Sequence, residues 1–98
     1  MTETTVPTVA TSTRLAADLI DQAATVDGLP APWTVVAHYH NVTLIFGTFR
    51  AVEQWADHFD VPWRFRRDDP IEFIDAEAMV GGVPVKLTSN RPVEEVEW

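Results

Sequence analysis

The chain contains no cysteine. This absence excludes a disulfide framework, catalysis by a thiolate and zinc sites built from cysteine ligands. Basic residues are also scarce, because seven of them, a single lysine among these, face 15 acidic residues and leave a formal net charge of −8. Binding to phosphate backbones requires clustered positive charge. We therefore expect no direct contact with nucleic acid.

Long hydrophobic runs are missing as well. No stretch approaches the roughly 18 consecutive apolar residues that a transmembrane helix needs, and the first residues show neither the positive nor the apolar region of a signal peptide. We therefore expect a cytoplasmic protein with no membrane partner. The absence of cysteine fits a reducing compartment.

What remains is the composition of an ordinary globular protein, with 46% hydrophobic and 22% charged residues. A chain of 98 residues has room for one hydrophobic core. Residues 1–12 are rich in threonine and lack periodicity, and residues 89–98 are acidic. We expect a flexible N-terminal tail at 1–12, a single domain at 13–88 and an acidic C-terminal tail at 89–98.

The pattern of apolar residues changes its period at Gly47. Residues 42–46 form a nearly continuous apolar run, typical of a strand, and Thr48 is a suitable N-cap for a helix after it. The apolar stripe of this helix recurs at i, i+3, i+4 and i+7, as Val52, Trp55, Ala56 and Phe59. This strand and helix both need a shared core, so they predict an α+β fold.

The other elements follow from similar patterns. We expect a first helix over residues 13–26 and further strands over residues 33–39, 61–67, 71–80 and 83–88. The resulting order is α-β-β-α-β-β-β. A right-handed crossover through the second helix would place the third strand beside the first. This predicts a mostly antiparallel five-stranded sheet in the order 2-1-3-4-5, with both helices on one face.

Gly81 and Gly82 predict the turn of the last hairpin, because two-residue hairpin turns favour glycine. This turn sets the pairs Val80–Val83, Ala78–Val85 and Ala76–Leu87. All six side chains then face the same side of the sheet, which supports the register.

The helix-free face of the sheet carries the candidate interface. With a turn at residues 68–70, Arg66 falls opposite Ile71 and Arg64 opposite Phe73, all on this face. Arginine and aromatic residues are enriched in interface cores, so we predict an interface here. The alternative is a solvated face on which arginine side chains cover apolar residues and pair with nearby carboxylates.

His38 and His40 are the candidates for a metal site, because residues at i and i+2 project from the same face of a strand. The alternative is a solvated histidine beside a turn histidine. Ser12 and Ser89 lie in the expected tails without a nucleophile-elbow motif. We therefore expect no enzymatic activity and no cofactor.

The segment Gly47-Thr48-Phe49-Arg50-Ala51-Val52-Glu53-Gln54-Trp55-Ala56, with Val83-Pro84-Val85 further along, resembles small uncharacterised proteins of actinobacteria and their phages and mobile elements. The resemblance covers about the middle half of the chain. It implies an intracellular accessory or regulatory role, and it implies no activity and no catalytic residues.

These observations predict a small non-enzymatic protein-interaction or regulatory domain. It would bind a protein partner, or a second copy as a homodimer, through the helix-free face. Two alternatives remain open. One is an acidic inhibitor that mimics nucleic acid and binds a basic protein. The other is a metal-dependent enzyme that uses His38 and His40.

Overall fold

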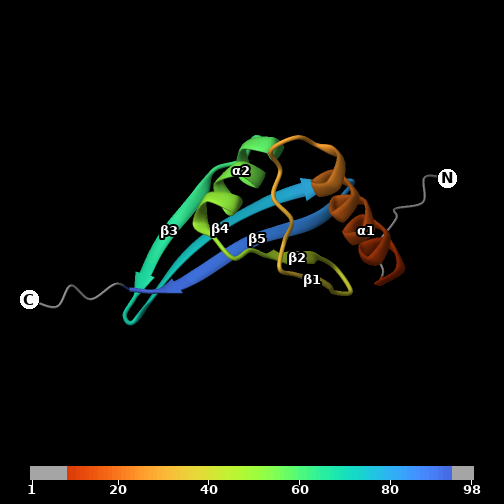
Figure 1. The fold of residues 1–98 in the computed structure, drawn as a ribbon. Coiled ribbons are helices and arrows are strands. Elements are labelled where there is room, and N and C mark those ends of the chain that lie inside the picture. Colours follow the sequence, from red (N-terminus) through yellow and green to blue (C-terminus); the bar gives the residue numbers. More distant parts are fainter. Residues whose placement is uncertain (1–8, 94–98) are drawn as a thin grey trace, which may run out of the picture.

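The structure is a computed structural model that describes residues 9–93. Along the chain it contains α1 (Val9–Thr25), β1 (Thr34–Ala37), β2 (Val42–Ile45), α2 (Phe49–Phe59), β3 (Trp63–Asp68), β4 (Ile71–Val80) and β5 (Val83–Pro92) (Figure 1). The predicted α+β class and element order are confirmed. No helix in this part of the chain is long and apolar enough to cross a membrane.

Both ends of the domain extend further than predicted. Helix α1 begins at Val9 and β5 ends at Pro92, so residues 9–12 and 89–92 belong to regular elements rather than to tails. The rest of the two expected tails, residues 1–8 and 94–98, lies outside the described part of the chain.

The five strands form one sheet in the order β1-β2-β5-β4-β3. Strands β2 and β5 are parallel, and every other neighbouring pair is antiparallel. The predicted order 2-1-3-4-5 is therefore wrong, and the sheet is mixed. That order would have placed β3 inside the sheet and β2 and β5 at its edges. Burial explains the observed order, because β2 and β5 carry fully buried apolar side chains while every side chain of β3 is exposed.

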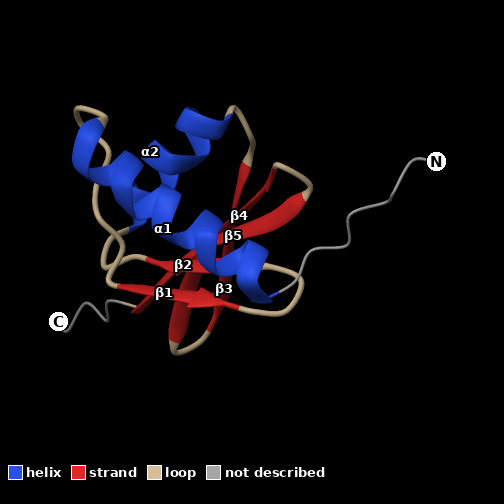
Figure 2. Cartoon of the chain, turned by 90° about the vertical axis from the view of Figure 1, so that its right-hand side faces the viewer, coloured by secondary structure: helices blue, strands red, loops and turns tan. Residues whose placement is uncertain are grey.

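The two helices lie on the same side of the sheet (Figure 2). Helix α1 packs on β1 and β2, and α2 packs mainly on β4 and β5. Thr48 caps α2 as predicted, because its hydroxyl accepts a hydrogen bond from the Ala51 amide at 3.2 Å. Within the predicted stripe of α2, Trp55 is completely buried, and its indole Nε1 donates to the carbonyl oxygen of Pro30 at 2.7 Å. This bond ties the core to the loop before β1.

The two long hairpins differ in how well the sequence predicts their register. The β4–β5 pairs Val80–Val83, Ala78–Val85 and Ala76–Leu87 are confirmed. In the β3–β4 hairpin, Asp68 pairs with Ile71 and Arg66 pairs with Phe73, so the predicted register is wrong by two residues. The reason is a turn of only two residues, Asp69 and Pro70. A shift of two residues keeps each side chain on its predicted face, because side chains alternate with period two.

Candidate protein-interaction surface

Strand β3 forms one edge of the sheet and has no strand on its outer side within residues 9–93. All six of its side chains are exposed. In an antiparallel pair every second residue directs its backbone N–H and C=O groups away from the partner strand. The outer edge of β3 therefore offers a row of backbone donors and acceptors to a further strand.

The two faces of β3 differ in chemistry. Arg64 and Arg66 project from the helix-free face, and Trp63 and Phe65 project from the opposite face. Trp63 is 42% exposed and Phe65 is 52% exposed. These two aromatic residues are not among the predicted interface residues. Their alternation with arginines along residues 63–66 is a sequence signal that could have indicated them.

On the helix-free face, Arg66 lies beside two residues of β4. Its guanidinium carbon is 4.7 Å from the centre of the Phe73 ring, and its Nη2 is 3.7 Å from Oδ2 of Asp75. The hydroxyl of Thr88 also donates to Asp75, at 2.8 Å. Arg66 therefore covers the Phe73 ring and keeps one carboxylate partner, as the alternative reading of a solvated face predicted.

The four predicted interface residues are only partly brought together. Arg66 contacts Phe73, whereas Arg64 lies opposite Asp75 rather than opposite Phe73. Ile71 lies at the turn, opposite Asp68, and is 38% exposed. The predicted interface is therefore a strip along β3 and β4, and its four residues do not form one compact cluster.

A shallow hollow of about 750 Å³ lies along this strip. Its lining residues come from β3, β4, β5 and the chain just before β3; they are Pro62, Arg64, Phe65, Arg66, Asp75, Ala76, Glu77 and Lys86. Three of them are basic and two are acidic. In a chain with a net charge of −8, this strip is locally basic.

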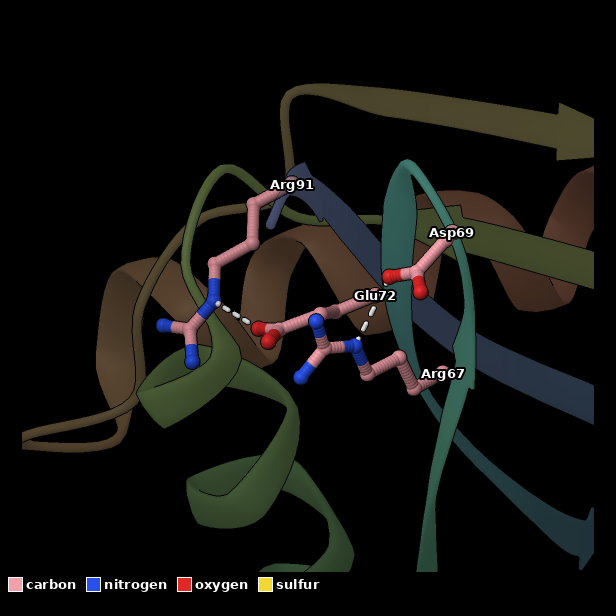
Figure 3. Close-up of polar contacts among 4 residues, drawn as sticks. All are labelled: Arg67, Asp69, Glu72 and Arg91. Carbon is pink, nitrogen blue, oxygen red and sulfur yellow. Dashed lines mark hydrogen bonds and ion pairs between the residues drawn. The ribbon is translucent and has the colours of Figure 1, made fainter. Parts of the chain in front are cut away.

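A second polar cluster lies on the helix side of the sheet, near the β3–β4 turn (Figure 3). Arg91 of β5 donates from Nε to Glu72 at 2.9 Å, and its guanidinium carbon lies 4.0 Å from the centre of the Phe49 ring. Arg67 donates from Nε to Asp69 at 2.8 Å. The hydrogen bond to Asp69 and the negative charge of Asp69 raise the pKa of Arg67, with a further contribution from Glu72. The ion pair with Asp69 holds the Arg67 side chain at this end of β3.

The edge of α2 contributes an aromatic contact to the same region. The rings of Phe49 and Phe65 meet edge to face, with their centres 6.1 Å apart. Arg91 of β5 covers the Phe49 ring. Phe65 keeps an exposed surface at the sheet edge. Five of the seven basic residues of the chain lie on β3 and β5; they are Arg64, Arg66, Arg67, Lys86 and Arg91.

The predicted metal candidates lie in the β1–β2 hairpin. The backbone amide of His38 donates to the Asn41 carbonyl at 2.7 Å, and the His40 ring packs edge to face against Tyr39. The third histidine, His58, is near Gln22 of α1, with 3.0 Å between Nε2 and Oε1. Within residues 9–93, no three histidine, aspartate or glutamate side chains lie together as a possible metal site.

The two serines do not lie in exposed tails. Ser12 lies in α1 and Ser89 in β5, and both side chains are buried. A buried hydroxyl cannot reach a substrate in solution, so the folded domain offers neither serine as a nucleophile.

No protein-family model, curated protein or solved structure matches this chain. The resemblance to small actinobacterial and phage proteins therefore stays a prediction.

Proposed function

We propose that this protein is a non-enzymatic protein-interaction or regulatory domain. It binds an extended, acidic polypeptide along β3 and the adjoining helix-free face, where Arg64, Arg66, Ile71 and Phe73 lie. The observation that carries the proposal is the free edge of β3, whose side chains are all exposed and alternate between aromatic residues and arginine over residues 63–66.

The backbone of β3 supplies the affinity in this mode of binding. A peptide that adds to a sheet edge pairs with the free N–H and C=O groups, and the alternating side chains select its sequence. Arg64 and Arg66 favour carboxylates on one face of the added strand. Trp63 and Phe65 favour apolar side chains on the other face. The preferred partner therefore alternates acidic and apolar residues.

Arginines on an edge strand also have a protective role, because charge at an edge discourages unspecific pairing between sheets. Protection alone does not require exposed aromatic rings between those charges. Two large rings exposed beside three arginines match the composition of interface cores. This pairing of residue types favours selective binding over simple protection.

A peptide-selection experiment tests the proposal. The immobilised protein is exposed to a random peptide library, and the bound peptides should be enriched in acidic residues that alternate with apolar ones. In the double variant R64E/R66E this enrichment should be lost. The matched control R14E/R50E makes the same change in net charge at two exposed helix positions and should keep it.

The same experiment separates the alternatives. A mimic of nucleic acid would capture basic peptides through its acidic surface, and R64E/R66E would leave that capture intact. Enrichment of basic peptides, or acidic enrichment that survives R64E/R66E, would overturn the proposal.

A further inference from the structure

We infer that residues 94–98 of a second copy of this chain occupy the edge of β3, as an added antiparallel strand. The inference rests on the proposed function and names the polypeptide that occupies the β3 edge. It depends on the sequence of these residues, Glu94-Glu95-Val96-Glu97-Trp98, on the exposed side chains of β3, and on where the chain leaves β5.

The segment and β3 have complementary alternating patterns. An antiparallel alignment gives the pairs Glu94–Arg67, Glu95–Arg66, Val96–Phe65, Glu97–Arg64 and Trp98–Trp63. Glu95 and Glu97 then meet the arginines of the helix-free face. Val96 and Trp98 meet the exposed aromatic residues of the other face. Each acidic residue faces a basic one, and each apolar residue faces an aromatic one.

Other alignments match less well. A parallel alignment keeps the residue types of the three central pairs but places Glu94 against Trp63 and Trp98 against Arg67. A slip of one residue moves every side chain to the other face, so that glutamates would face aromatic rings. The antiparallel register therefore satisfies the most pairs. Two residues of opposite charge that face each other across two strands are favourable, and so are two facing aromatic residues.

The antiparallel register above does not fit the segment of the same copy. The Val93 amide donates to the Pro70 carbonyl at 2.8 Å, so the chain leaves β5 at the β3–β4 turn. The outer side of β3 lies three strand spacings from β5, or about 14 Å, whereas consecutive Cα atoms are about 3.8 Å apart. Glu94 therefore cannot reach a place opposite Arg67 in its own copy, while a second copy has no such constraint.

Pairing of β3 with β3 of a second copy is the obvious competitor. Each β3 carries three arginines, and an antiparallel pair of these strands places like charges close together, which is unfavourable. The acidic segment removes that repulsion and supplies the opposite charge. If two copies each donate their segment to the other, the exchange closes a two-fold dimer.

The experiment uses the full-length chain and measures self-association by sedimentation velocity over a range of concentrations. We expect the wild-type chain to dimerise. The variants R64E/R66E and E95K/E97K should each weaken association at least about tenfold, because each places like charges opposite one another. The control R14E/R50E should associate like the wild type. Circular dichroism of each variant checks that it is folded.

Charge exchange gives the decisive result. An equimolar mixture of R64E/R66E and E95K/E97K should associate again, because the glutamates on one β3 meet the lysines of the other segment. The quadruple variant R64E/R66E/E95K/E97K should also associate with itself. A monomeric wild-type chain, or a mixture that fails to associate, would overturn the inference.

The proposed function and the inference can fail separately. If the wild-type chain is monomeric but still selects acidic peptides through Arg64 and Arg66, only the inference fails. If the peptide selection is indifferent to these arginines, the proposed function fails as well.

Discussion

Ser89 lies on the core side of β5, is 1% exposed, and has a hydroxyl without a hydrogen-bond partner in the described part of the chain. A buried polar group without a partner costs about 1–3 kcal/mol. We expect Ser89→Ala to raise the free energy of unfolding by about 1 kcal/mol, measured by urea denaturation.

The neighbouring residue gives a matched control. Thr88 lies on the other face of β5, and its hydroxyl donates to Asp75 at 2.8 Å. Thr88→Val keeps the shape but removes this bond, so it should lower the free energy of unfolding by about 0.5–1 kcal/mol. Equal effects of the two changes would show that the Ser89 hydroxyl has a partner.

Trp55 is the largest fully buried side chain of the domain as described. Its ring lies 5.7 Å from the rings of both Phe46 and Phe59, centre to centre, and its Nε1 is bonded to Pro30. Trp55→Phe removes buried volume and this bond, so it should cost about 2 kcal/mol of unfolding free energy.

Trp63→Phe is the matched control, because it makes the same chemical change at an exposed position. Trp63 is 42% exposed at the sheet edge, so Trp63→Phe should change the unfolding free energy by less than about 0.5 kcal/mol. Thermal and urea unfolding of both variants compare the two sites. A similar loss at both would contradict the assignment of Trp55 to the core and Trp63 to the surface.

At the scale of elements, the β4–β5 turn sets the register of the two longest strands. Gly81 and Gly82 both have positive φ, at 57° and 81°. A residue with a Cβ in the left-handed region costs about 1–2 kcal/mol, and asparagine tolerates it better than alanine. We expect Gly82→Ala to lower the unfolding free energy by about 1 kcal/mol, and Gly81→Asn to lower it by less than about 0.5 kcal/mol.

Amide hydrogen exchange in β4 and β5 measures whether these variants also lose protection. The core side of both strands is apolar, so a slip of one residue would expose it. We therefore expect the register to survive both changes. A redistribution of protected amides along the hairpin would show instead that the turn alone maintains the register.

At the scale of the whole molecule, the possible metal-dependent enzyme can be tested directly. No potential metal-ligand group is assembled within residues 9–93. We expect protein purified without a histidine tag to contain no stoichiometric metal. Added zinc should leave the midpoint of thermal unfolding unchanged, because a ligand stabilises the folded state only when it binds there. A stoichiometric metal or a clear rise of the midpoint would favour the enzyme based on His38 and His40.

The sequence predicted the elements well because their signals are local. The stripe of α2 follows from the spacing of Val52, Trp55 and Ala56, and the β4–β5 register follows from two adjacent glycines. The candidate surface was predicted in part. Arg64 and Arg66 were assigned to the correct face, because a register error of two residues leaves the alternation unchanged. The β3 edge and its aromatic residues were missed.

The strand order was decided only by the tertiary structure. The helices cover one face of the sheet, and β2 and β5 fill that face with buried apolar side chains, whereas every side chain of β3 is exposed. That comparison requires the burial of residues far apart in the sequence. The predicted handedness of the crossover through α2 gives no information about this burial.

The sequence by itself determined the fold class, the element order and the chemistry of β3, because periodicity and side-chain type act within a few residues. Only the tertiary structure decided that β3 is an edge with a free row of backbone groups. It also decided that the chain leaves β5 beside Pro70. Both facts come from packing between distant segments, where the core selects the most apolar strands for the centre and leaves the arginine-rich strand outside.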